Sequence, residues 1–227
     1  MRLSIVIPVL NEGPRISATL ALLAPLRERG CEVIVVDGGS TDGTPALAST
    51  GADRVLTAPR GRASQMNAGA AAACGDVLTF LHADTMLPDK ADRLVEDGLA
   101  RTGRIWGRFD VQFTNSALPL IAAAMNLRSR LTGIATGDQA IFVTRAAFET
   151  VGGFPEIALM EDIALSARLK RLSRPLCLVA RVTTSPRRWQ TQGVVRTVLL
   201  MWRLRLAFFL GARPDALARA YGYAPKH

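Results

Sequence analysis

The chain has 227 residues, of which 49% are hydrophobic and 21% charged, and its net charge is +9. This is the composition of a globular domain, and it excludes disordered, collagen-like and low-complexity chains. Its three scattered cysteines are too few for a disulfide framework or a paired-cysteine metal site, and their odd number favours a reducing compartment, which we take to be the cytoplasm.

Three short apolar runs rich in β-branched residues predict strands that are covered on both faces: residues 3–9, 32–37 and 76–81. Between them, helical spacing of apolar residues predicts helices over 15–29 and 62–73. The first run is not a signal peptide, because charge and proline follow before a cleavage site develops. This alternation predicts an α/β fold with a mostly parallel sheet flanked by helices, and such sheets bind ligands at the carboxyl ends of their strands.

Each of these three strands is followed by a carboxylate: Glu12, Asp37 and Asp84. One acid at a strand end is commonly a helix cap, but three at one sheet edge indicate a cleft for a nucleotide held through a divalent metal. The glycine-rich turn at 37–45 lacks both the Gly-Lys-Ser/Thr of a P-loop and the GxGxxG spacing of dinucleotide folds. ATPase and hydride-transfer functions are therefore disfavoured.

Further along the chain, residues 118–127 form an apolar helix candidate that suits the core or the wall of a substrate site. Glu161 and Asp162 precede a segment with a helical apolar stripe, a place where carboxylates are common electrostatic caps. A strand pattern, LCLVARVTT, then leads into Arg187, Arg188 and Trp189, which suit phosphate and sugar-ring recognition or an exposed basic pair beside a core tryptophan.

The end of the chain is strongly basic. Residues 168–227 hold 11 Arg and two Lys against one acid, a net charge of +12, whereas residues 1–167 carry −3. Residues 194–210 are apolar nearly all round but too short and too rich in arginine to span a bilayer. Three environments fit this segment: an anionic membrane surface, a second subunit in a homodimer, or the protein's own core. Nucleic acid is not an expected partner, because only 6% of residues are aromatic.

Together these motifs resemble the family 2 glycosyltransferases, inverting enzymes of the GT-A fold, a Rossmann-like α/β architecture. The matching pieces follow the family's order: IVIPVLNE, VVDGGSTDGT, GRASQMNAGA, FLHADT, GDQAIF, GGFPEIALMEDIALSARLKR and SPRRW. The set also resembles a bacterial subgroup labelled for arsenosugar biosynthesis. The resemblance implies a GT-A domain over residues 1–190, and the charge and apolar pattern beyond it predict a helical basic tail over residues 191–227.

The resemblance implies a nucleotide site near the first two strand ends. Glu12 would accept hydrogen bonds from the ribose, and Asp37 would read the base, plausibly a uracil N–H. Gly38 stands where many relatives have a second acid, which leaves the base less certain. The residues implied for nucleotide binding are Pro8, Asn11, Glu12, Asp37, Arg62, Gln65 and Asn67, with Arg60 nearby.

The resemblance also implies a metal site, holding Mg²⁺ or Mn²⁺, in His82-Ala83-Asp84. Asp84 would be the metal ligand that lets the ion bridge the two phosphates. His82 replaces the family's first acid and suits Mn²⁺ better than Mg²⁺, but a role as a hydrogen-bonding residue fits it equally well.

Finally, the resemblance makes Asp162 the general base that takes the proton from the acceptor hydroxyl. The residues implied to face the acceptor or the diphosphate are Asp138, Glu161, Arg187, Arg188 and Trp189, and Gly152 with Gly153 would let the backbone approach the sugar. The predicted activity is metal-dependent, inverting transfer from a nucleoside diphosphate sugar, with UDP as the expected nucleotide, to an unidentified acceptor, in the cytoplasm or at the inner face of its membrane. Two alternatives remain, a non-catalytic nucleotide-sugar binding module and a basic protein that binds membrane surfaces.

Overall fold

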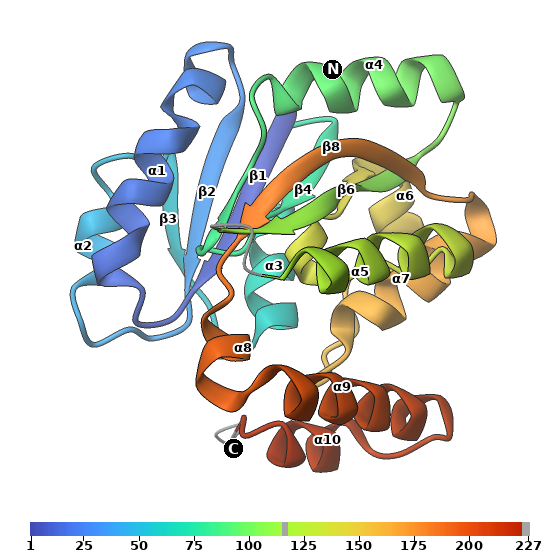
Figure 1. Ribbon diagram of the computed structural model, residues 1–227. Coiled ribbons are helices and arrows are strands. Elements are labelled where there is room, and N and C mark those ends of the chain that lie inside the picture. Colours follow the sequence, from blue (N-terminus) through green and yellow to red (C-terminus); the bar gives the residue numbers. More distant parts are fainter. Residues whose placement is uncertain (115–117, 224–227) are drawn as a thin grey trace.

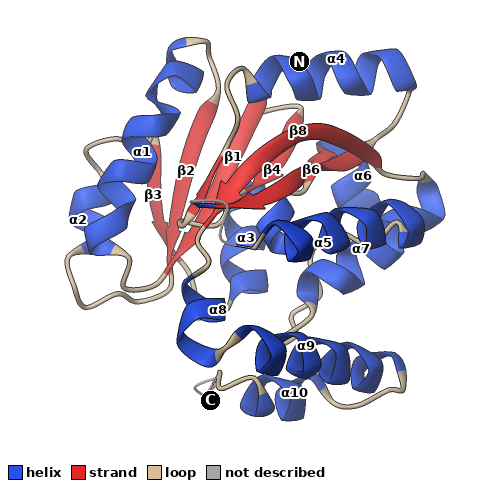
Figure 2. Cartoon of the chain, viewed as in Figure 1, coloured by secondary structure: helices blue, strands red, loops and turns tan. Residues whose placement is uncertain are grey.

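The computed structural model describes residues 1–114 and 118–223, except for the side chain of Arg188. At its centre the described residues form an eight-stranded sheet with the order β3-β2-β1-β4-β7-β6-β8-β5 (Figures 1 and 2). The strands are β1 (Leu3–Val9), β2 (Glu32–Asp37), β3 (Arg54–Thr57), β4 (Val77–Phe80), β5 (Thr85–Met86), β6 (Trp106–Phe113), β7 (Phe142–Thr144) and β8 (Leu176–Thr184).

The sheet has a parallel half and a mixed half. From β3 to β4 all neighbours are parallel, whereas β7 runs antiparallel to both of its neighbours and β8 pairs in parallel with β6. The predicted strands over 3–9, 32–37 and LCLVARVTT are confirmed, and the run at 76–81 contains β4. The sequence gives no clear signal for β7, which is short, or for β6, where buried Arg108 and Asp110 interrupt the apolar pattern.

Helices cover both faces of the sheet. The described helices are α1 (Gly13–Glu28), α2 (Thr44–Ala48), α3 (Arg62–Ala72), α4 (Ala91–Thr102), α5 (Pro119–Thr132), α6 (Arg145–Thr150), α7 (Glu161–Leu172), α8 (Arg187–Gln192), α9 (Val194–Phe209) and α10 (Pro214–Ala220), with a 3-10 turn at Gly137–Gln139. Side chains of α1 and α4 pack into one core cluster with the sheet, and those of α3, α6 and α7 pack into a second.

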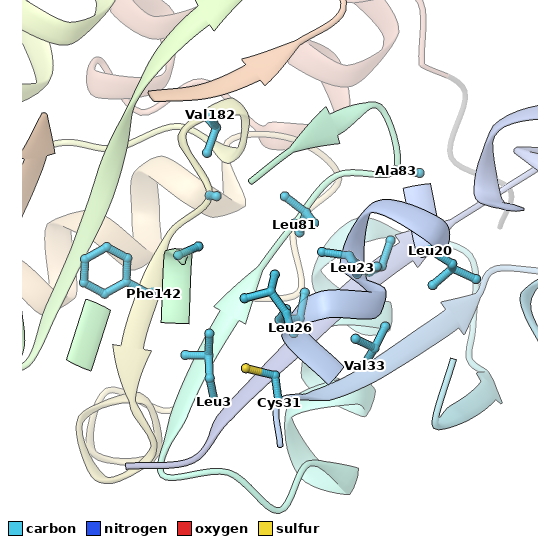
Figure 3. Close-up of a cluster of buried hydrophobic side chains, with 14 of the residues drawn as sticks. Leu3, Leu20, Leu23, Leu26, Cys31, Val33, Leu81, Ala83, Phe142 and Val182 are labelled. Carbon is cyan, nitrogen blue, oxygen red and sulfur yellow. The ribbon is translucent and has the colours of Figure 1, made fainter. Parts of the chain in front are cut away.

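Strand β1 shows how the two cores are divided by the pleat. Ile5 and Ile7 point into the first cluster and Val6 into the second, because successive side chains of a strand point to opposite faces. In the first cluster Leu20 and Leu23 of α1 lie over the sheet (Figure 3). A strand covered on both faces in this way reads as a continuous apolar run, which is why β1 and β2 were recognisable in the sequence.

The C-terminal helices form a third cluster at the end of the molecule toward which β1 and β2 run (Figure 1). Leu204 of α9 and Leu217 of α10 are buried there against Met160 and Ile163. The opposite face of α9 is exposed. Across residues 1–114 and 118–223, no helix combines the length and the apolar character that crossing a bilayer requires.

Candidate functional site

A cavity of about 460 Å³ lies at the carboxyl edge of the sheet. It is lined by seven residues that the sequence singled out: Glu12, Arg62, His82, Asp84, Asp138, Arg187 and Trp189. The rest of the wall comes from Phe113, Ala158, Leu159, Thr184, Ser185, Thr197, Met201, Tyr221 and Tyr223. Segments far apart in the chain therefore meet in one place, as the rule for parallel sheets predicts.

Asn11 and Asp37 shape the loops beside this cavity. Asp37 is buried, and one of its carboxylate oxygens accepts hydrogen bonds of 2.9 Å from the backbone N–H groups of both Gly39 and Ser40. Asn11 has a left-handed φ of +54°, and its side-chain oxygen accepts a 2.9 Å hydrogen bond from the Thr41 N–H. Pro8 lies in β1, in register with Val36. The structure thus shows these side chains holding strand ends and the glycine-rich turn, and a contact with a base stays a prediction for Asp37.

Gln65 and Asn67 of α3 also bond to backbone. The buried Gln65 amide donates to the carbonyl oxygens of Val9 and Val36, at 2.8 and 2.7 Å. Asn67 donates to and accepts from the backbone of Phe154, both at 2.9 Å. Gly153, beside Phe154, has a φ of +68°, and a Cβ there would lie 2.8 Å from the Asn67 side-chain oxygen. Gly152 and Gly153 line a separate cavity together with Asn67, so the structure places them away from the cleft.

Two charged residues that the sequence predicted for nucleotide binding line the cavity. Glu12 forms an ion pair of 2.9 Å with Arg15 and still lines the cavity. Arg62 begins α3, and its Nε lies 2.8 Å from Oε1 of buried Glu161 on α7. The guanidinium of Arg62 is thereby fixed at the cavity wall. Arg60, just before this helix, lies over the ring of Tyr223, with its guanidinium carbon 5.7 Å from the ring centroid.

His82 and Asp138 lie in contact with each other at the cavity wall. The His82 Nδ1 lies 3.5 Å from an oxygen of Asp138, and Gly137 packs so closely that a Cβ there would be 2.4 Å from His82 Nε2. Burial opposes protonation of the imidazole, but the contact with Asp138 outweighs it and raises the pKa of His82. Conversely, burial would raise the pKa of Asp138, and the contact with His82 lowers it.

Asp84 lines the same cavity as this pair, so carboxylate and imidazole ligands for a divalent cation are present. In the described part of the chain, no cluster of three or more His, Cys, Asp or Glu side chains is arranged to hold a metal by itself. Magnesium is commonly bound by one or two carboxylates, with substrate phosphates and water completing its shell. The residues fit a metal of that kind, which a diphosphate would bring with it.

Asp162, the predicted base, lies at the start of α7 beside a smaller cavity of about 90 Å³ that adjoins the first. Arg62, His82 and Asp138 line both cavities. The Asp162 carboxylate accepts hydrogen bonds from the Gly137 N–H at 2.8 Å and from the Ile163 N–H at 2.7 Å. These contacts fix its position without neutralising its charge.

The predicted basic and aromatic loop forms the first turn of α8. Arg187 is exposed at the start of this helix and lines the larger cavity. Trp189 lies edge-on to Phe113, with ring centroids 6.0 Å apart, so it is anchored to β6 at the cavity wall. The side chain of Arg188 lies outside the described part of the structure.

The sequence did not predict that the C-terminal helices would complete the cavity wall. Met201 of α9 and the chain's two tyrosines, Tyr221 and Tyr223, line the cavity. The available signal was the aromatic pair itself, because both tyrosines lie two residues apart in YGY. Apolar periodicity alone could not show which surface the C-terminal helices cover.

Comparison with known proteins agrees with this geometry. Residues 4–139 match the model of glycosyl transferase family 2. A probable glycosyltransferase of Bacillus subtilis, YdaM, is 27% identical over an alignment of 239 residues. The alignment covers 92% of this chain and 55% of that protein. The succinoglycan biosynthesis protein ExoA of Rhizobium meliloti is 40% identical over 106 residues, 42% of this chain and 32% of that protein. The chain thus spans about half or less of the length of these relatives.

Solved structures share the fold. Staphylococcus aureus TarS, crystallised with UDP-GlcNAc, aligns with a TM-score of 0.69 at 18% identity, over 82% of this chain and 58% of that one. The mannosyltransferase PcManGT of Pyrobaculum calidifontis, in complex with GDP-Man and Mn²⁺, aligns with a TM-score of 0.62 at 20% identity, over 97% of this chain and 69% of that one. These similarities confirm the predicted GT-A fold.

Proposed function

Because the chain belongs to glycosyl transferase family 2, we propose that it transfers a sugar from a nucleoside diphosphate sugar to an acceptor hydroxyl, with inversion at the anomeric carbon. The observation that carries this proposal is one cavity lined by Glu12, Arg62, Asp84 and Asp138, with Asp162 beside it. TarS and PcManGT are solved with UDP-GlcNAc and GDP-Man, which supports a nucleotide-linked donor. UDP is the nucleotide we propose.

The cavity provides groups for each part of such a donor. Glu12 presents carboxylate oxygens that can accept hydrogen bonds from ribose hydroxyls. Arg62, fixed by Glu161, and Arg187 supply guanidinium groups suited to the two phosphates. Trp189 adds a flat apolar surface against which a sugar ring can pack.

The leaving diphosphate must be stabilised as its bond to the sugar breaks. We propose that Asp84, with His82 or Asp138, holds Mg²⁺ or Mn²⁺ together with the phosphates. When bound, such an ion neutralises the charge that develops on the leaving group. The contact between His82 and Asp138 keeps both side chains directed at the cavity, and the Gly137 backbone confines the imidazole.

Asp162 completes the reaction as the general base. The acceptor oxygen forms a bond to the anomeric carbon while the bond from that carbon to the diphosphate oxygen breaks, and the acceptor proton passes to the Asp162 carboxylate. Hydrogen bonds from Gly137 and Ile163 orient this carboxylate, so its position does not depend on substrate. One base and in-line placement of the acceptor are sufficient for inversion.

We further propose that the exposed face of α9 contacts an anionic membrane surface. Trp202 is 68% exposed, and Val195, Leu199, Leu206 and Phe209 lie exposed along the same face of the helix. Exposed Arg196 and Arg203 flank them, so apolar and basic groups occur together as in interfacial helices. Binding to vesicles of phosphatidylglycerol that weakens strongly for Trp202→Ala supports this assignment. Dimerisation in solution through this face, without vesicle binding, contradicts it.

UDP release tests the proposed transferase. The full chain is incubated with a panel of UDP-sugars and Mn²⁺, and free UDP is measured. Release with at least one donor is expected, and EDTA and Asp84→Ala should each abolish most of it. Activity unaffected by both treatments would refute the metal assignment. No release for any sugar, with nucleotide-dependent thermal stabilisation that survives Asp162→Asn, would indicate a non-catalytic binding module instead.

A further inference from the structure

Two arginines near Asp162 have buried nitrogens that lack a hydrogen-bond partner in the described part of the chain. Among the described residues, Nε and Nη2 of Arg128 on α5 and Nε of Arg205 on α9 are buried and have no hydrogen-bond partner. Neither guanidinium forms an ion pair with a described carboxylate. Leaving a charged donor buried and unpaired is costly, so such groups in a folded protein call for a reason.

Two neighbouring arginines, Arg108 and Arg130, do have hydrogen-bond or ion-pair partners. Arg108 of β6 is fully buried, yet it bonds to Asp110, to the Ser129 hydroxyl and to the Asn126 carbonyl oxygen. Arg130, two residues from Arg128 on α5, pairs with the other oxygen of Asp110 at 2.6 Å. The Asp110 carboxylate is therefore already shared by Arg108 and Arg130, and among the described residues Arg128 forms no ion pair with it.

One of the two unpaired arginines, Arg205, lies at the smaller cavity, and Arg128 lies close to Arg205. Arg205 lines this cavity together with Asp162, Asp138 and Thr136. Arg128 lies close enough to Arg205 for their charges to repel, and burial together with this repulsion lowers the pKa of Arg128 to about 10. Arg128 is therefore still cationic at neutral pH, as arginine side chains in proteins are in general. The cavity of about 90 Å³ has room for a phosphate-sized group, since one water molecule occupies about 30 Å³ in the liquid.

We propose that Arg128 and Arg205 bind an anionic group, a phosphate or a carboxylate, carried by the acceptor. This inference rests on the proposed function, because it takes Asp162 as the base that marks the acceptor side. An anion there would pair both guanidinium groups and relieve their repulsion. The donor diphosphate is served by Arg62 and Arg187 at the larger cavity, which leaves these two arginines for the second substrate.

Binding of inorganic phosphate to the full chain tests this site. The chain is first saturated with UDP and Mn²⁺, so that the donor site is filled, and phosphate is then titrated while thermal unfolding is followed. Phosphate should raise the melting temperature of the wild-type chain. In Arg128→Gln and Arg205→Gln its apparent affinity should fall by at least about tenfold, the loss expected for one charge-assisted hydrogen bond.

Arg171→Gln is the matched control, because Arg171 is an exposed arginine on α7 and its loss removes the same charge. It should leave phosphate binding unchanged. Equal weakening in the control, or phosphate stabilisation that persists in both site variants, overturns the proposal. So does a loss of UDP affinity in Arg205→Gln, which would assign these arginines to the donor.

Two more measurements identify the source of the anion and separate the anion site from the transferase. If the anion is a lipid head group, Arg205→Gln weakens binding to phosphatidylglycerol vesicles, whereas an acceptor-borne group leaves vesicle binding unchanged. Phosphate binding does not require turnover. A chain that binds phosphate through these arginines but releases no UDP would therefore refute the transferase while leaving the anion site in place.

Discussion

Two regions of the cleft use polar side chains in opposite ways. At the parallel half of the sheet, three polar side chains form hydrogen bonds with the protein's own backbone: Asp37, Gln65 and Asn67. Near Asp162, buried nitrogens of Arg128 and Arg205 have no hydrogen-bond partner among the described residues. We call the first group the loop frame and the second the open arginines.

This difference distinguishes residues that hold the fold, the loop frame, from residues that are available to a ligand, the open arginines. A buried polar group that is fully bonded stabilises one conformation, and here it fixes the strand ends that carry Glu12 and the glycine-rich turn. A buried charged group without a partner destabilises the free chain and gains free energy when a ligand supplies the missing bond. Resemblance to a family assigned nucleotide contacts to the loop frame and named neither of the open arginines, and the hydrogen bonds of the structure distinguish the two groups.

The largest effect is expected at the base. Asp162→Asn should lower the rate of UDP release in the presence of acceptor by about 10²–10⁴, because the acceptor proton has no base to receive it. The amide oxygen can still accept from the Gly137 N–H, so folding and UDP affinity should be retained. Steady-state rates measure the loss of turnover, and calorimetric titration measures whether UDP affinity is retained. A variant with wild-type rates would remove Asp162 from the mechanism.

Substitutions in the loop frame should instead lower the stability of the fold. Gln65→Leu leaves the carbonyl oxygens of Val9 and Val36 without its two donated bonds and should lower the free energy of unfolding by about 2 kcal/mol. Urea denaturation measures this loss, and Gln190→Leu at an exposed position of α8 serves as control. If Gln65→Leu kept its stability but lost UDP binding, Gln65 would contact the nucleotide directly.

Substitution of an open arginine should change the free energy of unfolding in the opposite direction. Arg128→Gln removes a buried, unpaired charge and should raise the free energy of unfolding of the ligand-free chain by about 1 kcal/mol. Arg108→Gln, which removes a bonded arginine of the adjacent strand, should lower it. Chemical denaturation of both variants compares them. A marked loss of stability for Arg128→Gln would mean that Arg128 is structural.

The last prediction concerns Cys31 in the first core cluster, at the opposite end of β2 from the loop frame. Burial raises the pKa of the Cys31 thiol to about 11, and Cys74 is exposed. At pH 8 the higher pKa alone lowers the thiolate fraction of Cys31 about a hundredfold. Cys74 should therefore react first with a thiol reagent, and single-cysteine variants followed by absorbance measure each rate. Comparable rates for Cys31 and Cys74 would mean that this core opens readily.

The sequence predicted the parallel half of the fold, because buried strands read as apolar runs, and its motifs named seven residues that line the larger cavity. It did not predict which polar side chains bond to backbone, since Asp37 and Glu12 follow strands in the same way and differ only in their three-dimensional neighbours. Nor did it reveal the open arginines, because pairing of Arg108 and Arg130 with Asp110 depends on how α5 packs on β6. Tyr221 and Tyr223 were missed for the same reason.

Calorimetric titration of the full chain with UDP, with and without Mn²⁺, tests the central claim that this cleft holds a nucleoside diphosphate. We predict one UDP bound per chain, with affinity that rises when Mn²⁺ is present and a rise that disappears in Asp84→Ala. GDP in the same titration should bind more weakly. Absence of UDP binding under both conditions would contradict the account.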